Sequence, residues 1–305
     1  MTVIAFLFGG QGADPPVVGA ELAERSRPAR ELLDIGSRAA GMDLPRLLRQ
    51  GSPKLHRTEV QQPAVVSVGL AAAGYLAEAG IRPAYVAGHS LGELAAWAAS
   101  GAVAPADAIS AAAFRGKLMR RLAEAYPGGM LALASGSEAG LDAALRHGRE
   151  HGELVMAAHN GPGEWSLSGE ETAIRAVARK FLSRRIPVQG AWHSPGMQDG
   201  VDEFTSLLSG LPRHRPWARF LSNRTGALVA DEMDIPGLIA GQLAHPVLWA
   251  KTLETLAAAG VSDFVAIGSE KFLRSLVYKN LGRGPRLHGA ETLAALDQAI
   301  RHLRP

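Results

Sequence analysis

The stretch that decides the fold is Gly88–His89–Ser90–Leu91–Gly92–Glu93, which follows the apolar run Ala84–Ala87 and leads into the Ala-rich segment Glu93–Ala99. This pattern predicts a strand that turns sharply through a serine into a helix, the setting of a G-x-S-x-G nucleophile elbow. The glycines leave room for a strained turn, so the Ser90 hydroxyl would stand clear of the backbone at a helix N-terminus, where free N–H groups favour an oxyanion. The alternative is an ordinary glycine-rich turn in which Ser90 caps the helix, but the strand before it and the helix after it favour a nucleophile.

The composition is that of a packed globular protein, with 47 % hydrophobic and 20 % charged residues among 305. This length accommodates about two domains, or one large domain with an insertion. The lack of cysteine excludes disulfides, thiolate metal sites and cysteine nucleophiles. Residues 1–8 lack the basic start of a signal peptide, and the apolar stretch 63–80 predicts a buried helix too weak to span a membrane. We therefore expect a cytoplasmic enzyme without a membrane partner.

The charge balance is mildly basic, since 32 Lys and Arg against 29 Asp and Glu give a net charge of +3 and a pI near 9.4. Neither an Arg-rich run nor an interleaving of aromatic and basic residues accompanies it, so the pattern does not predict a nucleic-acid partner. A basic surface of this kind suits an acidic partner protein.

Short Val/Ile/Ala-rich runs alternate with Ala/Leu-rich segments, and this order predicts an α/β fold with a mostly parallel sheet. The predicted strands are Val3–Phe8, Ala84–Ala87, Phe220–Leu221 and Asp263–Ile267.

One segment departs from this alternation and follows the order strand, helix, strand, strand, helix, strand, which is the ferredoxin-like motif. Its elements are predicted at 130–134, 138–149, 154–159, 165–168, 171–183 and 186–189, with a turn at 161–163. The sequence thus predicts a large domain formed by residues 1–126 and 191–305, and a small ferredoxin-like domain, residues 127–190, inserted into it.

A serine nucleophile needs a base, and His193 is the preferred candidate. It lies in Ala191–Pro195, just past the predicted insert, where the chain returns to the large domain and a crevice between domains is expected. His89 adjoins Ser90, but neighbouring side chains at such a turn diverge. His159 and His245 remain candidates, and a packed structural side chain is the simplest interpretation of any one histidine.

Two further features suit acyl chemistry. The loop Gly9–Gly12 follows the first predicted strand, and a backbone N–H from it would complete an oxyanion hole with the N–H of Leu91. It matches neither a dinucleotide-binding fingerprint nor a P-loop. Arg115 follows the apolar helical stretch Asp107–Ala113 and is either a surface helix end or a buried anion clamp, whose planar fork would bind a carboxylate through two hydrogen bonds.

Together these motifs resemble, over essentially the whole chain, the malonyl-CoA:acyl-carrier-protein transacylases and the acyltransferase domains of polyketide synthases. The matching segments, in family order, are Phe8–Gly12, Gln62–Ala64, Gly88–Glu93, Arg115–Met119, Asn160–Pro162, Ala191–Ser194 and Gln242–Trp249. The resemblance implies an α/β-hydrolase-like large domain with a ferredoxin-like insert, in agreement with the pattern of the elements. It places Asn160 at a turn of the small domain.

The resemblance also implies a ping-pong mechanism in which His193 takes the proton of Ser90 and Ser90 attacks a malonyl thioester. The N–H groups of Gln11 and Leu91 would hold the oxyanion, and Arg115 would pair with the malonyl carboxylate. The other residues implied at the substrate site are Gln62, Met119, Trp192, Asn160 and His89, and the backbone carbonyl that orients His193 would come from the segment at Gln242. The expected substrates are malonyl-CoA and a phosphopantetheinyl acyl carrier protein, with no cofactor or metal, and the expected state is a monomer.

Some residues depart from the family pattern. The loop has Gly10 before Gln11 where a Pro-Gly pair is usual, and Ala13–Pro16 replaces a serine-glutamine continuation. Trp192 stands where malonyl-specific members commonly carry phenylalanine, and its bulk should disfavour α-branched acyl groups. Ala266 stands where an acidic residue is common. These departures favour a specialised member serving secondary metabolism.

Two other functions fit the same sequence. A hydrolase that removes acyl groups from carrier proteins would use Ser90 and His193 with water as the acceptor, although it would have no use for Arg115 on neutral chains. A non-catalytic module that docks carrier proteins would need neither residue.

Overall fold

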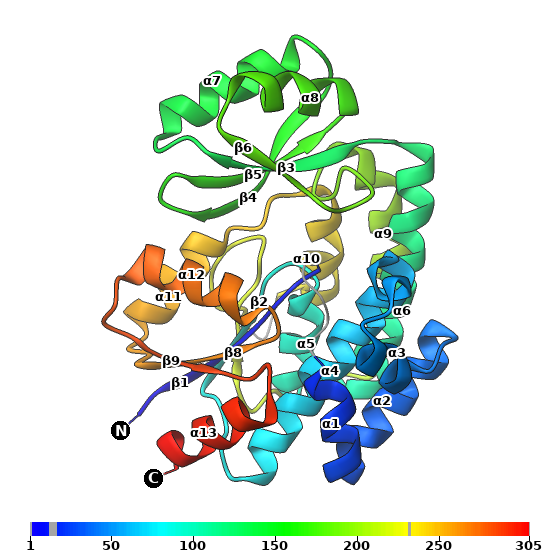
Figure 1. The fold of residues 1–305 in the computed structure, drawn as a ribbon, viewed down its shortest axis with the longest axis vertical. Coiled ribbons are helices and arrows are strands. Elements are labelled where there is room, and N and C mark those ends of the chain that lie inside the picture. The colour runs from blue at the N-terminus through cyan, green and yellow to red at the C-terminus, as the bar shows by residue number, and fades with distance from the viewer. Residues whose placement is uncertain (1, 12–16, 231–232, 305) are drawn as a thin grey trace.

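The computed structural model of the chain describes residues 2–11, 17–230 and 233–304. In these residues the strands form two sheets, a parallel sheet in the order β7-β2-β1-β8-β9 and an antiparallel sheet in the order β4-β5-β3-β6 (Figure 1). The strands of the parallel sheet are β1 Ile4–Phe8, β2 Tyr85–Gly88, β7 Arg219–Phe220, β8 Asp263–Ile267 and β9 Arg286–Gly289. The predicted α/β fold class is confirmed.

Strand β1 lies in the middle of the parallel sheet and is covered by helices on both faces. Its five residues are all buried, because alternate side chains enter cores on opposite faces of the sheet. Phe6 and Phe8 belong to the core cluster that also contains buried residues of helices α4 Thr58–Glu78, α5 Gly92–Ala99 and α6 Pro105–Ala125. Residues Ala5 and Leu7 pack on the other face with helices α11 Trp249–Ala258 and α12 Glu270–Leu281.

Strand β9 was missed by the sequence analysis. This strand lies at the sheet edge, and its sequence, Arg286 to Gly289, has little apolar character, because Arg286 and His288 contact Asp263 and only Leu287 packs against the core. Arg286 Nη2 donates to Asp263 Oδ2 at 2.6 Å, and the ring of His288 lies 3.0 Å from Oδ1. Side-chain contacts with a carboxylate thus accompany the pairing with β8, and hydrophobic periodicity does not report such contacts.

Helix α4 contains the apolar stretch predicted as a buried helix. By length and composition this helix could cross a membrane, since its most apolar 18-residue stretch has a mean hydropathy of 1.2. However, 78 % of that stretch is buried inside the fold. It packs against α2 Arg27–Ala40 and against α6, so its apolar surface is covered by protein.

The small unit has the predicted β-α-β-β-α-β order. Its elements are β3 Gly129–Ala134, α7 Glu138–Arg149, β4 Leu154–Gly161, β5 Glu164–Gly169, α8 Glu171–Lys180 and β6 Ser183–Ile186. The prediction was wrong about the last two: α8 ends three residues early and β6 starts three residues early. Strand β6 pairs with β3 through Met130 opposite Ile186, and its exposed Arg184 and Arg185 mark an edge strand without an apolar pattern.

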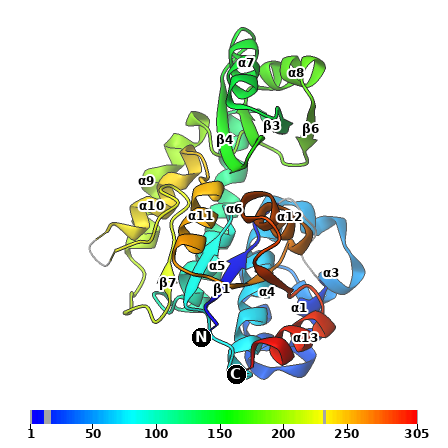
Figure 2. The same ribbon diagram turned by 90° about the vertical axis from the view of Figure 1, so that its left-hand side faces the viewer.

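The two units meet at the ends of the parallel strands. Figure 1 and Figure 2 show the small unit at one end of the molecule, with α7 and α8 on the side of its sheet away from the larger unit. The domain boundaries proposed at 126/127 and 190/191 stay predictions. The other helices are α1 Val18–Arg25, α3 Leu44–Gln50, α9 Val201–Ser209, α10 Ile235–Gly241 and α13 Leu293–Leu303, with 3-10 turns η1 Pro53–His56, η2 Pro195–Gly200 and η3 Gln242–Ala244.

Candidate active site

Ser90 lies between β2 and α5, in the strand-to-helix turn that the sequence predicts. Its φ of 52° is in the left-handed region, which is unusual for a residue with a side chain and marks a strained turn. The turn is stabilised by Asn223, whose Oδ1 accepts from Ser90 N–H at 2.7 Å and whose Nδ2 donates to Gly88 O at 2.6 Å. The arrangement is that of a nucleophile elbow.

The elbow requires glycine at position 88, and this gives a stability prediction. A Cβ on Gly88 would lie 2.0 Å from the backbone carbonyl of Gly92, closer than any real contact. We expect Gly88→Ala to destabilise the protein by about 3 kcal/mol, because the backbone must shift to relieve the overlap. Denaturant unfolding measures this. The matched control is Gly74→Ala in α4, where the added Cβ meets nothing within 4 Å; equal stability of the two variants would contradict the prediction.

His193 is the histidine that reaches Ser90. Its Nε2 lies 2.8 Å from Ser90 Oγ, and its Nδ1 lies 2.7 Å from the backbone carbonyl of Gln242. A carbonyl only accepts, so Nδ1 carries the hydrogen and Nε2 is left as the base. Burial first, and then the positive charge of Arg115, lower the pKa of His193 to about 3.

The other candidate histidines point elsewhere. The His89 ring lies 2.8 Å from Asn160 Oδ1, and burial lowers its pKa to about 4. The ring of His159 stacks on Trp165, and Nδ1 of His245 lies 2.8 Å from the carbonyl of Gly241. Asn160 itself lies within strand β4, so its predicted position in a turn was wrong; β4 extends to Gly161.

The low pKa of His193 gives a prediction about pH. Only the neutral imidazole accepts a proton, so lowering its pKa from 6.5 to about 3 keeps the base active to lower pH. We expect acylation of the enzyme by a neutral acyl-CoA to show no acid limb between about pH 5 and 7, measured as kcat/KM. A limb with an apparent pKa near the ordinary histidine value would contradict it.

Arg115 is buried in the middle of α6, so the surface alternative is wrong. It is 2 % exposed. Its Nη1 donates to Gln62 Oε1 at 2.9 Å and its Nη2 to Gln242 Oε1 at 3.0 Å, while Nη2 lies 3.4 Å from Ser90 Oγ. Burial lowers its pKa to about 10, which still leaves the guanidinium charged at neutral pH. A fixed positive charge therefore lies beside the nucleophile.

Gln62 links several of the predicted residues. Its Nε2 donates to Thr58 Oγ1 at 2.9 Å and approaches Met119 Sδ at 3.3 Å and Gln11 Oε1 at 3.4 Å. Thr58 in turn donates to Gln11 Oε1 at 3.0 Å. Thr58 was missed by the sequence analysis, since a threonine at a helix start is typical of capping. This chain of bonds links the side chain of Gln11 to Gln62, which in turn accepts from Arg115.

The proposed oxyanion donors lie on neighbouring segments. The N–H groups of Gly92 and Glu93 donate within the turn, to the carbonyls of His89 and Ser90 at 3.0 Å each. No acceptor among the described residues takes the N–H of Leu91. The loop that carries Gln11 lies against the elbow, since a Cβ on Gly10 would meet the His89 carbonyl at 2.5 Å. Gly12 and Ala13–Pro16, the segment that differs from the family pattern, lie outside the described residues.

Two buried residues of the site were not assigned a role from the sequence. Asn223 holds the elbow, as described above, and its backbone N–H donates to Glu93 Oε1 at 2.7 Å. Glu93 is fully buried, and burial raises its pKa to about 7. The sequence did contain a sign of a role for Glu93, because this acidic residue ends the elbow motif and stands in an otherwise apolar helix. An acidic residue in a first turn is, however, typical of interaction with the helix dipole.

A cavity of about 660 Å³ opens between the two units, and Ser90, His193 and Arg115 all line it. The small unit contributes an apolar wall that includes Met130 and Ile186. Trp192 completes this side; it is 4 % exposed, and its indole Nε1 has no hydrogen-bond partner among the described residues. The predicted residues Gln11, His89, Met119 and Asn160 also line the cavity. Gln62 and Gln242 lie behind it, in contact with Arg115.

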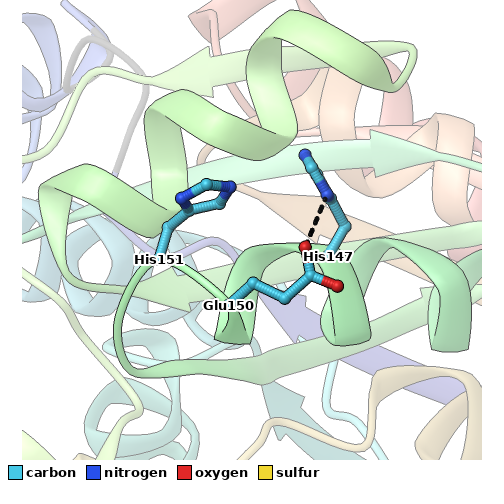
Figure 3. A group of neighbouring side chains, drawn as sticks. All are labelled: His147, Glu150 and His151. Atoms are coloured by element: carbon cyan, nitrogen blue, oxygen red, sulfur yellow. Dashed lines mark ion pairs between the residues drawn. The ribbon is translucent and has the colours of Figure 1, made fainter.

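A separate group of side chains could hold a metal ion. Figure 3 shows His147, Glu150 and His151 at the end of α7, with His147 Nδ1 3.4 Å from Glu150 Oε2. They do not line the cavity around Ser90. An ion bound there would be remote from the nucleophile.

The chain is similar to acyltransferases in sequence. The family model "Acyl transferase domain" matches residues 5–278. The chain is 35 % identical over 276 residues to the polyketide synthase GfsB of Streptomyces halstedii, covering 87 % of this chain but 5 % of that one. It is 32 % identical over 312 residues to the malonyl CoA-acyl carrier protein transacylase of Bacillus subtilis, covering 100 % of this chain and 98 % of that protein.

Solved structures agree. The malonyl-CoA:acyl carrier protein transacylase of Xanthomonas oryzae superposes with a TM-score of 0.89 at 29 % identity, covering 100 % of both chains. The chain thus spans a small part of a polyketide synthase and nearly the whole of a discrete transacylase. The resemblance found in the sequence is confirmed: this chain belongs to the acyl transferase domain family.

Proposed function

We propose that this protein transfers a malonyl group from CoA, through an acyl-serine at Ser90, to the phosphopantetheine thiol of an acyl carrier protein. The observation that carries the proposal is the buried Arg115 guanidinium 3.4 Å from Ser90 Oγ, beside a serine–histidine pair. A short acyl group on Ser90 that ends in a carboxylate would place that carboxylate within reach of this charge. Relatives named malonyl CoA-acyl carrier protein transacylases support the assignment.

The first half-reaction acylates Ser90. His193 Nε2 takes the hydroxyl proton as Oγ attacks the thioester carbonyl, and the C–O bond forms. The N–H groups of Leu91 and Gln11 stabilise the tetrahedral oxyanion. The C–S bond then breaks, and CoA leaves as a thiol with the proton that His193 returns. The Gln242 carbonyl keeps the imidazole in the tautomer that this step needs.

The second half-reaction mirrors the first. The phosphopantetheine thiol gives its proton to His193 Nε2 and attacks the acyl-serine carbonyl, and Ser90 Oγ leaves with the same proton. Both steps use only groups of this chain and of its two substrates, an acyl thioester and a carrier-protein thiol, so we propose an enzyme without cofactor or metal. The same proposal includes a cytoplasmic location and a monomeric state.

Selectivity follows from charge and size. Arg115 favours a carboxylated acyl group, because a buried guanidinium binds a carboxylate through charge-assisted hydrogen bonds that a neutral acyl group does not make. The Trp192 ring forms part of the cavity wall and narrows the space for the acyl group, so malonyl is favoured over an α-branched group such as methylmalonyl. Gln62, Met119, Asn160 and His89 would shape the remainder of the acyl site.

The test is the intact mass of a holo acyl carrier protein incubated with the enzyme and malonyl-CoA, with the released CoA thiol followed alongside. Transfer predicts a malonyl increment on the carrier and an equal amount of thiol. The same carrier in its apo form, which lacks the phosphopantetheine thiol, is the matched control and should gain nothing. Thiol release without an increment, on a carrier that accepts malonyl chemically, would identify a hydrolase instead. Neither thiol nor increment would leave a non-catalytic docking module.

A further inference from the structure

We propose that Glu93 is a positioning residue for malonyl selectivity: it fixes the side-chain amide of Gln242, which in turn holds the guanidinium of Arg115 toward the acyl group. This inference rests on the proposed function. Glu93 does not line the cavity and touches no substrate; it would act on Arg115 from behind, chiefly through Gln242.

The hydrogen bonds define the orientation of the Gln242 amide. Its Nε2 donates to Glu93 Oε2 and to the Ser90 carbonyl, the latter at 3.1 Å. Its Oε1 is thereby turned to Arg115 and accepts from Nη2 at 3.0 Å. Gln242 is 1 % exposed, so water does not replace these partners. One amide therefore connects the acid, the nucleophile's backbone and the anion-binding guanidinium.

Glu93 is suited to this position because both of its oxygens accept. Oε1 takes the backbone N–H of Asn223 at 2.7 Å, and Oε2 takes the Gln242 amide. The Ser222 hydroxyl also interacts with the carboxylate. A backbone N–H cannot be reversed, so the side chain at position 93 must present an acceptor to Asn223 and a second acceptor to Gln242. Only a carboxylate does both.

Charge reinforces the geometry. Glu93 and Arg115 are opposite charges in the buried layer behind Ser90, and each opposes the effect of burial on the other's pKa. The groups that face Glu93 are Asn223 and Ser222 beyond β7, Gln242 of η3 and Arg115 of α6. All of them are hydrogen-bond donors or a cation, which suits an ionised carboxylate. Removing one member of such a buried network leaves the hydrogen-bond donors of the others without a partner, which is costly.

Replacing Glu93 with glutamine isolates the role, since the shape is kept but one oxygen becomes an NH₂ group. The remaining oxygen must face Asn223, so the new NH₂ meets the Gln242 amide. Gln242 then reverses and turns its own NH₂ toward Arg115. The guanidinium loses an acceptor and gains a repelling donor.

The experiment compares formation of malonyl-enzyme and acetyl-enzyme at Ser90, by intact mass in single turnovers with malonyl-CoA and acetyl-CoA. For Glu93→Gln we expect the preference for malonyl to fall about 30-fold, equivalent to about 2 kcal/mol, mainly through a higher KM for malonyl-CoA. Glu124→Gln, an exposed acid of α6 paired with Arg120, is the matched control and should keep the wild-type preference. In an Arg115→Ala background, Glu93→Gln should cause little further loss, because its effect passes through Arg115.

A pH profile of the wild-type enzyme supplies a second readout. A protonated Glu93 carries a donor, as glutamine does, so the malonyl preference should fall as pH drops through about 7 and Glu93→Gln should show no such change. His193 and His89, with pKa values lowered to about 3 and about 4, stay neutral over this range, and Arg115 stays charged. The profile decides the matter even if the variant does not fold.

The outcomes are separable. Equal losses on malonyl-CoA and acetyl-CoA would assign Glu93 a merely structural role and overturn the inference, as would an unchanged preference in Glu93→Gln or, if that variant does not fold, a flat wild-type profile. A wild-type enzyme without any malonyl preference would instead overturn the proposed function.

Discussion

Arg115→Ala is expected to lower kcat/KM for malonyl-CoA about 100-fold or more and to raise the activity on acetyl-CoA relative to it. The guanidinium is the positive charge that lies beside Ser90 Oγ, so its loss leaves a malonyl carboxylate in a buried site without a counter-charge. A neutral acetyl group has no such requirement. Competition between malonyl-CoA and acetyl-CoA for one holo carrier protein, resolved by mass, measures the change.

Loss of Arg115 also leaves Gln62 and Gln242 without their donor, so stability must be followed in parallel. The matched control is Arg121→Ala, because Arg121 lies on the same helix but is exposed and paired with Glu203. That variant should retain both activities and their ratio. An Arg115→Ala enzyme that is folded and keeps the wild-type preference for malonyl would refute the role of the guanidinium.

Ser90→Ala is expected to abolish the acyl-enzyme and to reduce transfer at least about 10⁴-fold, because no other hydroxyl replaces the nucleophile of a two-step mechanism. Alanine and serine both carry a Cβ, so the strained φ of 52° is retained and the elbow should keep its shape. The measurement is the intact mass of the enzyme after a brief exposure to malonyl-CoA.

Wild-type protein should gain one malonyl group in this assay, and Ser90→Ala none. Ser110→Ala serves as the control, since the Ser110 hydroxyl is exposed and donates only to the Ala106 carbonyl of its own helix. A full malonyl increment on the Ser90→Ala protein would place the nucleophile elsewhere. Carrier binding that survives without any catalysis in the wild type would favour the docking module.

The main features of the fold were predictable where local signals and burial agree. Strand β8 matches its predicted bounds because both faces of Asp263–Ile267 are covered, which produces a continuous run of buried residues. The β-α-β-β-α-β order of the small unit was predictable from the succession of its strand-like and helix-like segments, although its strands are not buried throughout. Edge strands β6 and β9 were misplaced or missed, because their residues meet solvent or ion pairs and carry no apolar period.

The site divides in the same way. The elbow at Ser90 is local, since glycines and serine in a fixed spacing can adopt only a few turns, and the sequence predicted it. His193 was preferred over other histidines from its place after the insert, and the structure brings its Nε2 within 2.8 Å of Ser90 Oγ. The roles of these residues in transfer stay predictions until the variants are assayed.

The sequence by itself determined the two-unit α/β architecture, the strained serine turn and the family. Only the tertiary structure decided that Arg115 is buried rather than exposed, that the side chain of Gln242 binds Arg115, and that Asn223 and Glu93 support the elbow. The physical reason is distance along the chain. A turn or a helix is specified by residues within a few positions of one another, whereas Glu93, Arg115 and Gln242 meet only because packing brings α5, α6 and η3 together and excludes water from their polar groups.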